Sequence, residues 1–268
     1  MENHPDQNSG PVRLAQAGLL AVRVQENSRD MAADAAELAR EHLRDALKAR
    51  GEASVIFACA TSQIQFLAAL AAQPGIDWSR ITVFHMDEYL GVGAGHPASF
   101  RRFLREHLVE RVHPGCVRYL EGDALEPMAE AMRYADLLQE RSIDLCCLGV
   151  GENGHIAFND PSVADFEDPL RVKIVRLDEA SRLQQVGEGC FSNLEAVPQY
   201  ALTLTIPALC DARHMLCVVP ERRKAQAIRM ALCGPVTTGC PASFLRRQSQ
   251  ATLCLDGDAA GEVDWTLL

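Results

Sequence analysis

The sequence predicts an α/β protein with a single doubly wound, mostly parallel sheet and helices on both faces, a Rossmann-like architecture. Short apolar runs alternate with longer amphipathic segments along most of the 268 residues. Several runs are apolar at nearly every position, as expected of strands that are buried on both faces. A hydrophobic content of 48% is enough for one continuous core. No repeat, low-complexity tract or Pro/Ser-rich linker divides the chain, which favours a single domain.

The polar residues 1–11 are expected to be flexible, and residues 12–268 to form the domain. The alternation begins with a strand at 19–24 and a long helix at 28–50, which Gly51 ends. Ser28 or Asp30 is the expected N-terminal cap of this helix. Later apolar runs predict strands and later amphipathic segments predict helices. The further strands are 54–60, 81–86, 143–150, 171–177, 200–205, 214–219 and 251–255, and the further helices are 63–72, 97–112, 124–140 and 221–233.

The charge balance excludes some classes of partner. The formal net charge of -10 and an isoelectric point near 5.3 argue against a nucleic-acid surface, which needs clustered Lys and Arg. No apolar run approaches the roughly 20 residues that span a bilayer, and the N-terminus lacks the pattern of a secretory signal. We therefore expect a cytoplasmic protein that binds a small molecule. An anionic substrate would need a local basic pocket.

The ten cysteines do not form a recognisable disulfide framework. Thiols in or beside strand-like apolar runs are usually buried and reduced. No CxxC pair or Cys/His cluster has zinc-site spacing, so no metal is expected. The cysteines within such runs are Cys59, Cys146, Cys147, Cys217 and Cys254.

A histidine follows the strand expected at 143–150, in a loop that also contains Gly149, Gly151 and Gly154. Ligands of open α/β sheets bind at the carboxyl ends of the strands, so His155 lies where chemistry is usually done. The order of these glycines does not match the dinucleotide fingerprint, and no NAD site is expected.

A histidine that moves protons needs a partner on its second ring nitrogen, and Asn153 and Asp160 are the nearby candidates. Asp160 could also raise the pKa of the imidazole. Alternatively, Asn153 and Gly154 only form a turn, since both tolerate positive φ. The two interpretations are compatible.

A carboxylate pair, Asp87 and Glu88, ends the strand expected at 81–86. Mutual repulsion and partial burial would raise the pKa of one carboxyl toward neutrality, as a general base requires. Taken alone, Asp87 could simply cap a turn while Glu88 faces solvent. Together with the His155 loop, the pattern favours a catalytic Asp87 and leaves Glu88 open. His85 and His96 are more typical of structural histidines.

Two motifs, FHMDEYLG at 84–91 and GVGENGHIAFNDP at 149–161, resemble those of the glucosamine-6-phosphate deaminase/isomerase family, to which the 6-phosphogluconolactonases are related. The likeness continues through VPQYALT at 197–203, Lys224 and CPASFL at 240–245. It covers nearly the whole chain from the strand at 19–24 onward.

The resemblance implies catalytic roles for four residues of the first two motifs. Asp87 would move a proton between C2 and C1 of an amino sugar, and His155 would open the pyranose ring. Asn153 and Asp160 would orient His155. Because Asp160 is one methylene shorter than the glutamate usual in the family, its hydrogen bond to His155 is expected to be longer or water-mediated. No cofactor is implied.

The residues implied to bind the substrate depart from the family in part. The loop ATSQIQ at 60–65 lacks the usual glycine and proline but keeps the hydroxyls of Thr61 and Ser62. Gly187 stands where the family has a phosphate-binding arginine, whereas Lys224 matches its phosphate-binding lysine. Arg182, Arg222 or Arg223 would replace the arginine, or the substrate carries a different group there. The other residues assigned to the substrate are Glu88, Gly149 and Gly151.

The leading functional hypothesis is an aldose-ketose isomerase and deaminase that converts a hexosamine 6-phosphate, or a close analogue, into a ketose phosphate and ammonia. A sugar lactonase and a non-catalytic sugar-phosphate-binding regulator are the alternatives. The resemblance also implies a homo-oligomer. It further implies an effector site for an N-acetylated sugar phosphate near Arg171 and Lys173, although alternating basic residues often just mark an exposed strand face.

Overall fold

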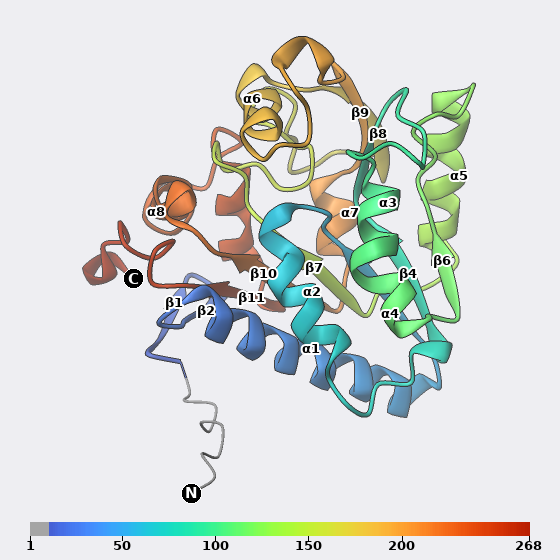
Figure 1. Cartoon of the computed structure of the whole chain (residues 1–268). Coiled ribbons are helices and arrows are strands. Elements are labelled where there is room, and N and C mark those ends of the chain that lie inside the picture. Colours follow the sequence, from blue (N-terminus) through green and yellow to red (C-terminus); the bar gives the residue numbers. More distant parts are fainter. Residues whose placement is uncertain (1–10) are drawn as a thin grey trace, which may run out of the picture.

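A computed structural model describes residues 11–268, so all of the expected flexible segment 1–11 except Pro11 lies outside the described residues. The main sheet has eight strands in the order β1-β2-β11-β10-β7-β3-β4-β6 (Figure 1). The edge strand β1 (Arg13–Ala17) pairs antiparallel with its neighbour β2 (Leu20–Val24), and every other neighbouring pair is parallel. The expected mostly parallel sheet is confirmed. The other strands are β3 (Ala53–Phe57), β4 (Ile81–His85), β6 (Cys116–Arg118), β7 (Leu145–Leu148), β10 (His214–Val219) and β11 (Ala251–Leu255).

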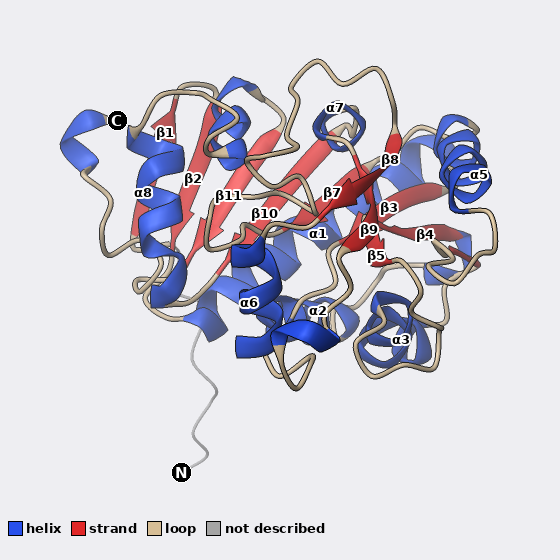
Figure 2. Cartoon of the chain, turned by 90° about the horizontal axis from the view of Figure 1, so that it is seen from above, coloured by secondary structure: helices blue, strands red, loops and turns tan. Residues whose placement is uncertain are grey.

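The central strands are apolar on both sides because each side meets its own hydrophobic cluster. In β7, Leu145 and Cys147 belong to one buried cluster and Cys146 and Leu148 to the other. One cluster receives α1 (Ser28–Arg50), α2 (Ile64–Ala71) and α3 (Phe100–Leu104), and the other receives α5 (Pro127–Gln139), α7 (Ile206–Cys210) and α8 (Ala225–Cys233). Figure 2 shows the strands between these helices. Helices on both faces are thus confirmed.

Helix α1 has the expected bounds but a different cap. The side chain of Asn27, rather than Ser28 or Asp30, accepts a hydrogen bond from the backbone N–H of Asp30. Asn27 lies one residue before the first helical residue, where the backbone is extended and a side-chain oxygen can reach back to the first turn. Gly51 ends the helix in the left-handed conformation with φ of 79°.

Two runs that were read as further strands of the doubly wound sheet belong to a second sheet. This three-stranded sheet contains β5 (Asp87–Tyr89), β9 (Tyr200–Leu204) and β8 (Val172–Arg176), and both of its pairings are antiparallel. An apolar run predicts a strand but not its partner, which explains the difference. The small sheet continues directly from the end of β4.

Other boundaries differ locally from the expected ones. The helix expected at 97–112 divides into α3, a π-helical turn at Arg105–Val109 and the short α4 (Glu110–Val112). The strands β1 and β6 and the helices α6 (Glu179–Gly187) and α7 were not foreseen. The buried residues of helix α6 are the polar Ser181 and Gln185, which do not mark the inner face of a helix in the sequence.

All ten cysteines lie in the described region, and none is in a disulfide. No helix within residues 11–268 is both long and apolar enough to cross a bilayer. The same residues contain no cluster of three side chains suited to holding a metal ion.

Candidate active site

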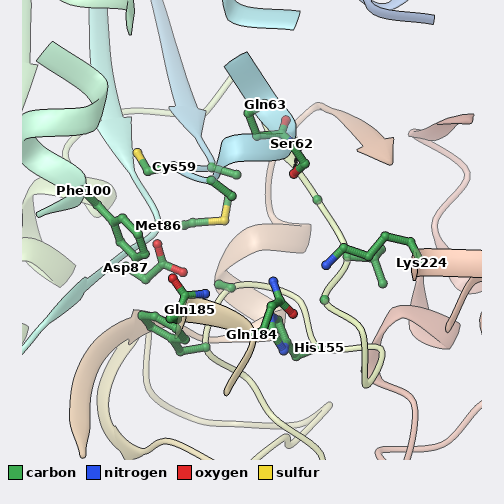
Figure 3. A pocket seen from close by; sticks show the side chains of 17 residues that line it. Cys59, Ser62, Gln63, Met86, Asp87, Phe100, His155, Gln184, Gln185 and Lys224 are labelled. Atoms are coloured by element: carbon green, nitrogen blue, oxygen red, sulfur yellow. Dashed lines mark hydrogen bonds between the residues drawn. The ribbon is translucent and has the colours of Figure 1, made fainter. Parts of the chain in front are cut away.

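A cavity that is open to solvent lies where β3, β4, β7 and β10 end. Asp87 and His155 both line it, and Figure 3 shows them with Lys224 and Ser62 around the same space. The sheet therefore brings together side chains that are 68 positions apart in the sequence (155 minus 87).

Asp87 begins β5 immediately after Met86 leaves the main sheet. Its side chain lines the cavity, although the residue is only 7% exposed. Burial raises the pKa of the Asp87 carboxyl well above its usual value, and the neighbouring charge of Glu88 raises it further. A carboxyl group with a raised pKa is a stronger base when ionised, which suits proton abstraction near neutral pH.

His85 fixes the backbone that presents Asp87. Its Nδ1 donates to the Asp87 carbonyl over 2.9 Å, and its Nε2 accepts from the Leu120 N–H over 2.9 Å. This pairing requires a neutral ring, and burial lowers the pKa of His85 to about 3. The structure therefore gives His85 a structural position, in agreement with the sequence-based interpretation.

His155 lies in the loop after β7, and its Nδ1 is held by Asn153 Oδ1 at 2.8 Å. Because an amide oxygen only accepts, Nδ1 carries the proton and Nε2 is left as an acceptor. Asn153 Nδ2 in turn donates to Asp160 Oδ1 over 3.1 Å, which fixes the amide orientation. The three side chains thus form an ordered chain of contacts behind the cavity.

Asp160 also approaches His155 directly, with 3.1 Å between Oδ1 and Nδ1. The contact is therefore direct rather than water-mediated, and it is longer than the 2.8 Å contact of Nδ1 with Asn153 Oδ1. Burial alone would raise the pKa of Asp160. However, the contacts from His155, Ser181 Oγ and the Asp178 N–H outweigh burial and lower it.

At two positions in this loop a side chain would clash with its neighbours, so only glycine fits. An added Cβ at Gly151 would lie 2.1 Å from Cε1 and 2.3 Å from Nε2 of His155, so the backbone packs directly on the imidazole. At Gly154 the φ of 84° is left-handed, and a Cβ would meet Cys240 Sγ at 2.7 Å. Both Gly149 and Gly151 line the cavity.

Strand β9 contacts both halves of the site. Thr203 pairs with Asp87 in the small sheet, and the Leu204 N–H donates to the Met86 carbonyl over 2.8 Å. On the other side, the Phe158 N–H donates to Thr203 Oγ1 over 3.1 Å, and Asn159 Nδ2 donates to the Leu204 carbonyl over 2.8 Å. One strand thus holds the Asp87 segment and the His155 loop in register.

Two residues assigned to substrate binding do not line the cavity. Glu88 is fully buried and accepts hydrogen bonds from Ser99 Oγ and from the backbone of Tyr89, Phe100 and Arg101, whose guanidinium lies 3.3 Å away. Thr61 instead donates its hydroxyl to Glu188 Oε2 over 3.1 Å. Glu88 therefore has a structural environment, because side chains alternate along β5 and only the Asp87 side faces the cavity.

Lys224 lines the cavity at the start of α8 and is 2% exposed. Figure 3 shows its amino group directed into the cavity. Burial lowers the pKa of Lys224 to about 8, although the charge of Glu188 partly opposes this shift. The buried charge of Lys224 therefore lowers the free energy of unfolding.

Replacing Lys224 with Met is expected to raise the free energy of unfolding at pH 7, because a pKa lowered from 10.5 to about 8 corresponds to roughly 3 kcal/mol. The unfavourable contribution is complete below pH 8, where Lys224 is charged in both states, and it disappears as pH rises toward 10.5. The difference in the free energy of unfolding between Lys224→Met and the wild type should therefore decrease between pH 8 and pH 10. Denaturant titrations measure it, with the exposed Lys48→Met as control. Equal stability of Lys224→Met and wild type at pH 7 would contradict this expectation.

Several residues that line or support the site were not foreseen from the sequence. Gln185 accepts a hydrogen bond from the Tyr89 hydroxyl at 2.7 Å, which leaves its amide nitrogen for the cavity beside Asp87 (Figure 3). Ser181 contacts both His155 and Asp160. These side chains come from α6, and no sequence signal placed them here because they are polar residues on its buried side. The others that line the cavity are Gln63, Phe100, Phe158 and Gln184.

A parallel α/β sheet with a carboxyl of raised pKa and an oriented imidazole on one cavity defines an enzyme that moves protons on a small polar substrate. Residues 26–254 match the family described as glucosamine-6-phosphate isomerases/6-phosphogluconolactonase, and the chain belongs to this family.

Relatives of known name have similar length. The chain is 36% identical over 188 residues to a glucosamine-6-phosphate deaminase of Exiguobacterium sp., covering 70% of this chain and 72% of that protein. It is 33% identical over 232 residues to one of Arthrobacter sp., covering 84% and 87% of the two chains.

Solved structures show the same fold. A monomeric glucosamine-6-phosphate deaminase superposes with a TM-score of 0.83 at 25% identity, covering 90% of this chain and 99% of that one. A 6-phosphogluconolactonase from Thermotoga maritima superposes with a TM-score of 0.71 at 20% identity, covering 88% and 98%, and shows the fold alone.

Proposed function

We propose that this enzyme is an aldose-ketose isomerase and deaminase of a hexosamine, producing a ketose and ammonia. His155 Nε2 accepts the anomeric hydroxyl proton and returns it to the ring oxygen as the ring opens. The Asp87 carboxylate then takes the proton from C2 and delivers it to C1, while the C1 oxygen gains the proton that the amino nitrogen loses. The resulting imine at C2 reacts with water to give the ketose and ammonia. Asn153 and Asp160 hold the His155 tautomer that this step needs.

The observation that supports this function best is that Asp87 and His155 line one cavity. Two groups are needed because ring opening and the C2-to-C1 transfer occur at different atoms of the sugar. A proton shuttle must reach both carbons, and a carboxyl with a raised pKa can exchange a proton in either direction near neutral pH. The relatives of known name are also glucosamine-6-phosphate deaminases.

An ammonia assay combined with ketose detection tests the function on glucosamine, galactosamine and their 6-phosphates. Ammonia and ketose are expected in equal amounts. A lactonase would instead release acid from a sugar lactone without ammonia, which pH-stat titration detects. A non-catalytic regulator would be stabilised by sugar phosphates without turning any of them over. Either of these outcomes would overturn the proposal.

Assembly and location complete the proposal. We infer that residues 12–268 act as one domain in the cytoplasm and form a homo-oligomer. Large hydrophobic side chains exposed beside and along α5 support association, since Leu125 is 97% exposed and Met128 and Met132 are 64% and 67% exposed. The similar deaminase structure is described as monomeric, so light scattering is the deciding measurement. A single species of monomer mass would contradict the oligomer.

A further inference from the structure

We propose that Glu188 determines the substrate class by excluding a phosphate ester, so that the enzyme takes a hexosamine with a free 6-hydroxyl. The inference rests on the proposed deaminase function and concerns the end of the cavity away from Asp87. At that end the Glu188 carboxylate already accepts two hydrogen bonds and forms an ion pair with Arg223, and a bound phosphate would need groups of this kind.

The orientation of the sugar follows from the proposed chemistry. Asp87 acts at C1 and C2 and His155 at the ring oxygen, which is bonded to C5. The C6 group therefore extends beyond His155, toward the far side of the cavity. Figure 3 shows Lys224 and Ser62 on that side, across the cavity from Asp87.

Glu188 lies behind this far side and has a side chain only 3% exposed. Its Oε2 accepts from Thr61 Oγ1 over 3.1 Å, and its Oε1 accepts from Gln184 Nε2 over 2.8 Å and pairs with Arg223 NH1 over 3.2 Å. A hydroxyl, an amide and a guanidinium are the groups that usually bind a phosphate. Here they hold a carboxylate that belongs to the protein.

The local charge also disfavours a dianion. Arg223 contacts three carboxylates, those of Glu152, Glu188 and Glu221. With Lys224, this end has two cations against three anions before any substrate binds. A phosphate monoester would add about 1.5 to 2 negative charges. Of the side-chain donors that line the cavity there, Gln63 and Gln184 already donate to the Val218 carbonyl and to Glu188. Ser62 and Lys224 remain, and together they suffice for a neutral hydroxyl.

The test compares kcat/KM for glucosamine and galactosamine, each free and as the 6-phosphate, in wild type, Glu188→Gln and Glu179→Gln. Gln keeps the shape of Glu188 and removes its charge. Glu179 is an exposed residue of the same helix and provides a control with the same charge change. The wild type is expected to prefer the free sugar by about tenfold or more, and Glu188→Gln to shift the ratio toward the phosphate ester by about tenfold. Glu179→Gln should keep the wild-type ratio.

Other outcomes separate this inference from the proposed function. A wild type that prefers the phosphate ester and releases ammonia overturns the inference and leaves the function intact. An unchanged ratio in Glu188→Gln, or an equal shift in Glu179→Gln, overturns the role of Glu188. If no sugar yields ammonia, the function fails, and calorimetry with inorganic phosphate still decides the inference. Phosphate should bind Glu188→Gln at least tenfold more tightly than wild type, and equal affinities would overturn it.

Discussion

The Asp87→Asn variant is expected to release ammonia about 10²- to 10⁴-fold more slowly than the wild type, because an amide cannot take the C2 proton. Its fold should remain intact, since Asn has the same shape and removes a charge that burial disfavours. The melting temperature should therefore be equal or higher. Steady-state ammonia release and differential scanning calorimetry measure the two effects.

Asp136→Asn is a matched control for Asp87→Asn. Asp136 lies on α5 and is exposed, so the same chemical change there should leave turnover and stability nearly unchanged. An Asp87→Asn variant that turns over as fast as Asp136→Asn would remove Asp87 from the mechanism. A large fall in its melting temperature would instead show a structural role.

Gly151→Ala is expected to lower turnover at least about 100-fold, because misplacing a catalytic group by about 1 Å can have such an effect. The new methyl group would overlap the imidazole of His155, at 2.1 Å from Cε1. Either the ring rotates away from Asn153 or the loop shifts, and both change the position of Nε2. The loss should appear in kcat, since the far end of the cavity is unchanged. Proton NMR of the His155 ring would detect its displacement.

Gly187→Ala provides the control, since an added Cβ there meets no atom within 4 Å. That variant is expected to match the wild type in turnover and to be slightly more stable, because alanine loses less backbone entropy on folding. Normal activity in Gly151→Ala would show that His155 can move without loss, and its proposed role would then be wrong.

The sequence predicted the main sheet well because its central strands are apolar on both faces. The runs around Val55, Val83 and Leu145 could be placed as parallel strands on this basis alone. The carboxyl ends of such strands meet at one edge, which is why Asp87 and His155 could be expected to share a cavity. That expectation needed only the periodicity of the chain and the position of the polar residues.

The sequence could not show contacts between distant segments. Glu88 and Asp87 look equivalent in the chain, but the pleat of β5 turns one toward Arg101 and the other toward the cavity. Helix α6 escaped prediction because its inner face is polar, and its residues Ser181 and Gln185 serve the site rather than the core. The pairing of Glu188 with Thr61 joins positions that no local pattern relates.

Strand β9 is hydrogen-bonded to both the Asp87 segment and the His155 loop. These bonds fix the distance between the two reacting groups. The loops that follow β3 and β10 can then change, and with them the choice of sugar, without altering that spacing. Efforts to redirect this enzyme to new substrates should accordingly vary the outer loops and leave Thr203 and Leu204 untouched.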